Sequence, residues 1–287
     1  MNLLNRNRQT PLQREWDSLC KREQSFLERR QKKKETALNR FLAEKVPEKL
    51  QGTLDQAFEK AFHLIFEKGT GVIEKTYSRD RMKKEFQVDC YADQVYASRK
   101  TLRSFSKKAG RAKGVNLALS GVSGIGMGIL GIGIPDIPVF TGMVLKCIYE
   151  IALRYGFDYH SQKEKYFILL LIEGAVSYGK HLEEVNQKIE AFMQNPGIPA
   201  GCHMKEQTAR TSSMLSKELL YMKFLQGIPV AGIIGGAYDV VYMKQISEYA
   251  DLKYHKRFLL GKKSGQEEKI FEVYRPDTII ITEKEQN

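Results

Sequence analysis

Hydrophobic residues recur at intervals of three and four along most of the chain, the spacing of an amphipathic α-helix. The segment from Leu50 to Ile65 shows this pattern, and no long segment alternates as a strand would. The sequence therefore predicts an all-α fold, an antiparallel helical bundle with at most one short terminal strand, over Thr278–Thr282. We expect its main helices at residues 10–45, 50–65, 81–108, 136–155, 161–172, 212–224 and 237–260.

Several residues indicate where these helices begin and end. Thr10 with Gln13, and Ser161 with Glu164, have the spacing of a capping box, in which a hydroxyl accepts from the backbone three residues on. Gly69 and Gly71 predict a turn. Gly156 and Gly261 follow apolar runs and are suited to the left-handed conformation that ends a helix.

A glycine-rich apolar run interrupts the charged sequence. Between Lys113 and Asp136 there is no charged residue, and a second glycine-rich stretch runs from Gly227 to Gly236. Small residues at this spacing let helices approach closely, either in a soluble core or in a membrane. We expect the two stretches to pack together as helical hairpins at the centre of the bundle. A hairpin that dips into a membrane is the alternative, because prolines at the end of the first run disfavour one straight spanning helix.

The charge of the chain points toward anionic partners. Its formal net charge is +12, and with 42% hydrophobic residues the chain is too apolar to be disordered. Seven basic residues without an acid among them lead into the uncharged run: Arg99, Lys100, Arg103, Lys107, Lys108, Arg111 and Lys113. A basic segment beside an apolar one suits an anionic membrane surface. A solvated helix face is the alternative; there is no clear nucleic-acid signature.

Candidate chemistry is sparse. Three acids lie in apolar surroundings, Asp136, Glu150 and Asp239, and together they could serve a hydrolase or a metal-dependent enzyme. The histidines and the four cysteines have no metal-ligand spacing, so we expect no structural metal, no cofactor and no disulfide framework. No small-molecule ligand can be identified. The segment before Lys75-Thr76 carries Glu74 where a phosphate-binding loop needs glycine, which argues against such a loop.

Two phrases of the sequence resemble the EcsC family. The first is Gly133-Ile134-Pro135-Asp136-Ile137-Pro138, followed by a helix that ends in Tyr155-Gly156-Phe157-Asp158; the second runs from Ile228 to Leu259. The resemblance covers roughly Ala92 to Leu260 and makes family-motif candidates of Asp136, Pro138, Glu150, Tyr155, Gly156 and Asp239. It implies a bacterial protein of the cytoplasmic side, whose family takes its name from an operon that encodes an ABC transporter, and it brings no established catalytic residue.

These observations predict three segments and one broad role. We expect a charged helical extension over residues 1–68, an EcsC-like helical domain over 69–262 and a polar tail over 263–287. The first residues, Met1–Arg14, lack the apolar core of a secretory signal, so we expect a cytoplasmic protein that is peripheral at the inner face of the membrane. Its expected partner is the anionic membrane surface or a membrane protein such as an ABC transporter.

Overall fold

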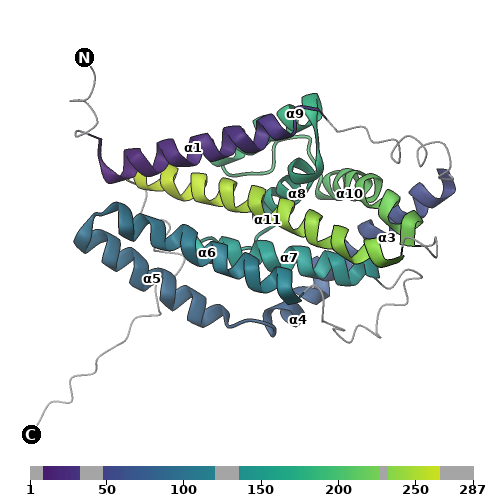
Figure 1. The fold of residues 1–287 in the computed structure, drawn as a ribbon, viewed down its shortest axis with the longest axis horizontal. Helices are drawn as coiled ribbons and strands as arrows, with labels where there is room; N and C mark the ends of the chain where they lie inside the picture. The colour runs from purple at the N-terminus through teal and green to yellow at the C-terminus, as the bar shows by residue number, and fades with distance from the viewer. Residues whose placement is uncertain (1–8, 33–47, 120–135, 227–231, 266–287) are drawn as a thin grey trace, which may run out of the picture.

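All regular structure in the computed structural model, which describes residues 9–32, 48–119, 136–226 and 232–265, is helical, and this confirms the predicted all-α class (Figure 1). The elements follow one another along the chain as α1 (Pro11–Arg29), α3 (Glu48–Leu64), a π-helical turn (Ile65–Gly69), α4 (Thr70–Glu74), α5 (Arg79–Tyr96), α6 (Arg99–Leu119), α7 (Asp136–Arg154), α8 (Gln162–Val176), α9 (Gly179–Gln194), α10 (Met204–Gln226) and α11 (Gly232–Lys263).

Two helices form the centre of this arrangement. From Tyr166 to Val176 every residue of α8 is buried, in keeping with a sequence whose single charged residue is Glu173. The long helix α11 packs against α8 and also against α1, α6, α7 and α10, and it runs along the length of the molecule in Figure 1. Phe258 of α11 lies against Phe86 of α5 and Phe105 of α6, so the aromatic core continues to the α5–α6 hairpin.

The hydroxyl caps predicted from the sequence are confirmed. Thr10 accepts the backbone N–H of Gln13 at 3.1 Å, and Ser161 accepts that of Glu164 at 3.2 Å. The helix that begins at Asp136 ends at Arg154, and Gly156 takes a left-handed conformation with φ of 81°. These boundaries were predictable because each depends on residues within one helical turn.

Helix α9 has no counterpart among the predicted helices, α10 begins at Met204 rather than near residue 212, and four further predictions about where helices end or turn were wrong. The expected helix 81–108 is divided at Ala97, which adopts φ of 41°, and the expected turn at Gly69 and Gly71 is instead a π-helical turn that continues into α4. The first helix ends at Arg29, where Arg30 turns to stack its guanidinium on the Tyr178 ring, 4.0 Å from its centroid. At the other end, α11 continues through Gly261 to Lys263. At each of these four positions the intrinsic conformational preference of the residues predicts a different outcome, and that preference is all that the sequence shows.

The segment predicted as an N-terminal extension packs onto the rest of the chain. Helix α1 contacts α6 and α11, and α3 contacts α7 and α10. The centres of both glycine-rich stretches, at 120–135 and 227–231, and the strand expected at Thr278–Thr282 lie outside the described residues. Of the helices that are described, none is long and apolar enough to cross a membrane.

Candidate functional site

The turn after α7 projects a short polar segment toward the surface. The N–H of Gly156 donates to the carbonyl of Leu153 and that of Phe157 to the carbonyl of Ala152, a pattern that closes the helix with a glycine in the left-handed conformation. The chain then leaves the helix axis and presents Asp158 and His160 before Ser161 starts α8. The Tyr155-Gly156 phrase therefore sets the position of these two polar side chains.

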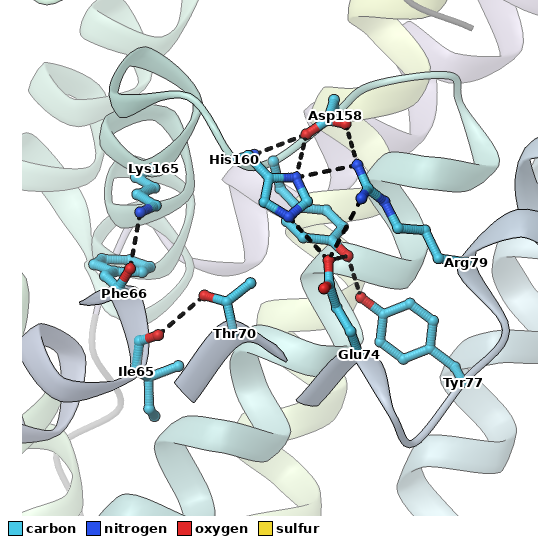
Figure 2. Close-up of polar contacts among 10 residues, drawn as sticks. Ile65, Phe66, Thr70, Glu74, Tyr77, Arg79, Asp158, His160 and Lys165 are labelled. Carbon is cyan, nitrogen blue, oxygen red and sulfur yellow. Dashed lines mark hydrogen bonds and ion pairs between the residues drawn. The ribbon is translucent and has the colours of Figure 1, made fainter. Parts of the chain in front are cut away.

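Asp158 and His160 meet two side chains, from Glu74 at the end of α4 and from Arg79 at the start of α5 (Figure 2). Arg79 forms an ion pair with Asp158 and lies 3.9 Å from Glu74. The His160 ring lies between the two carboxylates, with Nδ1 2.5 Å from Asp158 and Nε2 2.9 Å from Glu74. Burial raises the pKa of Asp158, but hydrogen bonds from His160 and the charge of Arg79 outweigh it and leave that pKa below its ordinary value.

Two tyrosines extend this charged cluster inward. Tyr159 donates its hydroxyl hydrogen to Glu74 at 2.6 Å, so the bond of 2.6 Å between Tyr77 and Tyr159 must use the hydrogen of Tyr77. Burial, and for Tyr159 also the bond to Glu74, raises the pKa of both phenols well above the ordinary value. Both therefore remain neutral hydrogen-bond donors, so that Tyr159 holds Glu74 in place and Tyr77 holds Tyr159.

A π-helical turn positions Glu74. Over Ile65–Gly69 the backbone is wider than an α-helix, and two carbonyls of this turn accept hydrogen bonds from side chains (Figure 2). The hydroxyl of Thr70 donates to the carbonyl of Ile65 at 3.0 Å, and the Lys165 ammonium donates to that of Phe66 at 2.9 Å. Helix α4 follows at once and ends at Glu74, which brings the carboxylate to the cluster.

A cleft of about 940 Å³ opens beside the cluster. Arg79, Asp158 and His160 line one side of it. On another side, Arg257 of α11 holds both carboxylate oxygens of Glu164, at 2.8 and 2.9 Å, and lies 4.2 Å from the centroid of the Phe157 ring. The cleft thus presents both signs of charge on a rigid framework. The described residues contain no group of three or more potential ligands placed to hold a metal ion.

Sequence reasoning missed most of this cluster, although signals for it were present. Asp158 closes the Tyr-Gly phrase, and the spacing of Glu164 from Ser161 indicates only a capping residue. Glu74 by itself indicates only that the segment before Lys75 is not a phosphate-binding loop. Arg79 and Arg257 are ordinary charged residues until the fold brings them to a common cleft.

The three acids singled out from the sequence do not form one site. Asp136 and Glu150 are 14 positions apart on α7, so the helical rise puts their backbones about 21 Å from each other. That is too far for two carboxylates to act on one reacting group. Glu150 is buried and lies 3.7 Å from the Lys146 ammonium. Asp239 belongs to α11; its side chain and that of Asp136 are outside the description.

The other motif candidates have structural contacts. Pro138 is buried in the first turn of α7. Backbone N–H groups in the first turn have no carbonyl partner within the helix, so proline, which lacks an N–H, breaks no hydrogen bond there. Tyr155 is fully buried and donates to Asp251 of α11 at 2.8 Å, and Asp251 in turn accepts from Arg22 of α1 at 3.0 Å. This tyrosine therefore ties the end of α7 to two other helices, next to the turn that presents Asp158.

The basic run lies on α6, and its members differ in their surroundings. Arg99 and Arg103 share the carboxylate of Glu15 on α1, and Lys108 pairs with Asp89 of α5 at 2.7 Å. Lys100 and Lys107 are exposed, and neither forms an ion pair with any residue that the structure describes. Arg111 and Lys113 continue the same helix, with side chains that fall outside the described part.

Comparison with known proteins extends the resemblance seen in the sequence. The model of the EcsC protein family matches residues 11–259, from α1 to α11. The match thus includes the N-terminal helices that lie before the segment Ala92–Leu260. Protein EcsC of Bacillus subtilis (strain 168) is 25% identical over 247 residues, which cover 85% of this chain and 92% of that protein. No solved structure matches the chain.

Proposed function

The chain belongs to the EcsC protein family, and from this premise we propose that it is an accessory protein that binds the anionic surface of a membrane. The observation that carries the proposal is the exposed basic stripe of α6, formed by Lys100, Arg103 and Lys107. These positions follow one another at three and four residues, so their side chains leave the helix on one face.

The contacts of Arg99 and Arg103 with Glu15 leave positive charge exposed on the surface of α6. Arg103 shares Glu15 with Arg99 yet keeps 56% of its side chain exposed, while Glu15 itself is buried. The acid is thus covered and the basic groups face outward. Each basic residue near an anionic surface contributes about 1 kcal/mol of attraction, so three of them contribute about 3 kcal/mol.

Two alternatives remain distinct from this proposal. A membrane protein with an acidic face, such as an ABC transporter, would use the same stripe, and the operon from which the family takes its name favours such a partner. An enzyme built on Asp136, Glu150 and Asp239 has little support, because the first two acids lie far apart on α7.

Vesicle flotation tests the proposal. The purified chain is mixed with neutral vesicles, or with vesicles that contain increasing fractions of phosphatidylserine, and is spun through a density gradient. We expect the floated fraction to rise with phosphatidylserine and to fall as salt is added, because salt screens exposed charges over about 10 Å at 0.1 M. Equal flotation with neutral and anionic vesicles would contradict the proposal, because binding would then depend on apolar contact and not on charge. No flotation with either would also contradict it and would favour a protein partner.

A further inference from the structure

Helix α5 exposes an unusual amount of apolar surface. The described residues contain six large hydrophobic side chains that are strongly exposed, and four of them lie on this helix: Val88, Tyr91, Val95 and Tyr96, with 66%, 70%, 56% and 72% of their surface accessible. Single exposed apolar residues are ordinary on a protein surface, whereas several on one short helix indicate a contact surface.

Three of these residues share one face of the helix. Val88, Tyr91 and Val95 are separated by three and four positions, so they leave α5 on the same side. Arg81 and Lys84 precede them at the same spacing and are also exposed. We call these five residues the α5 stripe. The opposite face carries Met82, Phe86 and Cys90, which are buried in the core.

The acids of α5 do not neutralise this surface. Asp89 pairs with Lys108 of α6, and Asp93 accepts from Thr101 and pairs with Lys262 of α11 at 2.8 Å, so both are turned toward the protein. Glu85 pairs with Arg154 of α7 and lies 3.5 Å from Arg81. Asp80, at the first turn, is the remaining acid of the helix. The exposed charges of the stripe itself, Arg81 and Lys84, are thus both basic and lie at its N-terminal end.

We propose that the α5 stripe lies in the interface of an anionic lipid bilayer, with Val88, Tyr91 and Val95 among the headgroups. This inference rests on the proposed function and assigns the face that contacts lipid. Tyrosine suits the interface because its ring is apolar and its hydroxyl is polar. The basic residues at one end of the stripe and the basic stripe of α6, the next helix of the hairpin, complement the phosphates. A second copy of the chain, which also carries a net charge of +12, would be repelled by these basic residues.

Tryptophan placed on the stripe reports its surroundings directly. Trp16, the single tryptophan of the chain, is replaced by phenylalanine, and Tyr91→Trp is made in that background. The matched control is Lys188→Trp, at an exposed site on α9, on the opposite side of the molecule (Figure 1). With phosphatidylserine vesicles we expect a blue shift for Tyr91→Trp and quenching by brominated acyl chains, and neither for Lys188→Trp.

Three results would overturn the inference in different ways. If the protein floats with anionic vesicles but Tyr91→Trp keeps its emission, another face contacts lipid and the proposed function stands. If the unsubstituted protein does not float, both proposals fail. If the emission shifts with protein concentration in the absence of vesicles, and sedimentation shows a dimer, a second copy covers the stripe.

Charge substitution provides a second readout that does not depend on tryptophan. Val88→Asp with Val95→Asp changes two exposed side chains, so the helical circular dichroism and the melting temperature should be preserved. We expect the vesicle affinity to fall at least about tenfold, since apolar contact is lost and two negative charges meet the headgroups. An unchanged affinity in this folded variant would contradict the inference.

Discussion

Substitution of Gly174 by alanine tests the crossing of α8 and α11 at the centre of the molecule. A methyl group built on Gly174 would lie 2.7 Å from Cε1 of Tyr249 and 3.1 Å from its hydroxyl oxygen. Tyr249 cannot easily move, because it is fully buried, stacks on Phe26 at 4.9 Å and donates to Asn186 at 3.0 Å. The substitution therefore overpacks the crossing.

The magnitude follows from two opposing effects. Alanine favours the helix over glycine by up to about 1 kcal/mol, while overpacking a core costs about 1–3 kcal/mol. Gly174→Ala should then lower the free energy of unfolding by up to about 2 kcal/mol. The matched control is Gly110→Ala on α6, where a methyl group meets nothing within 4 Å and only the helix preference acts. This control should be stabilised by up to about 1 kcal/mol.

Thermal unfolding followed by circular dichroism measures the difference. For a chain of this length 1 kcal/mol corresponds to roughly 2 °C, so the melting temperature of Gly110→Ala should exceed that of Gly174→Ala by roughly 2–6 °C. Equal rises in both variants would refute the reasoning, since they would mean that the α8 backbone does not touch Tyr249.

Three further predictions concern the charged core and the turn after α7. Lys253→Met should lower the free energy of unfolding by about 1.5–3 kcal/mol in urea titrations, because the buried carboxylate of Glu23 then keeps only one of its two ammonium partners, Lys256 at 2.8 Å. Burial raises the pKa of Glu23, but Lys253 and Lys256 outweigh it and depress the folded-state pKa, so its stabilising contribution is present above the unfolded pKa of about 4.3 and is lost as the pH falls through the folded value. Glu23→Gln should therefore flatten the loss of stability below about pH 5, and an unchanged pH profile would speak against this coupling. Gly156→Ala should cost about 1–2 kcal/mol in the same titrations, since φ of 81° is unfavourable for any residue with a side chain; a smaller loss would mean that the turn after α7 can relax.

The elements were predictable from the sequence where the determinants are local. The hydroxyl caps of Thr10 and Ser161, and the glycine after α7, act within one turn of the helix that they bound. The division at Ala97 was not predictable, because alanine favours helices and its left-handed conformation there departs from its intrinsic preference. The same holds for Gly174, an ordinary glycine in the sequence that becomes a close contact only through Tyr249, 75 positions later.

The candidate site depends even more on long-range contacts. Glu74 and Arg79 precede Asp158 and His160 by about 80 positions, and no periodicity or spacing links the two pairs. The resemblance draws attention to the Tyr155-Gly156 phrase but does not give its structural role, which is to end α7 and anchor it to Asp251. The basic run was visible in the sequence, whereas its division into residues that pair with Glu15 or Asp89 and residues that face outward required the fold.

Charge reversal on α6 tests the central claim, that the basic stripe of this helix binds an anionic membrane. Lys100→Glu with Lys107→Glu is compared in vesicle flotation with Lys188→Glu and Lys217→Glu, which make the same change in net charge at exposed sites on α9 and α10. Loss of two attractions of about 1 kcal/mol each corresponds to roughly thirtyfold, so the α6 variant should bind phosphatidylserine vesicles at least thirtyfold more weakly, while the control keeps most of its affinity. Equal losses in the two variants would contradict the account, because they would show that net charge alone, and not the α6 stripe, holds the protein to the membrane.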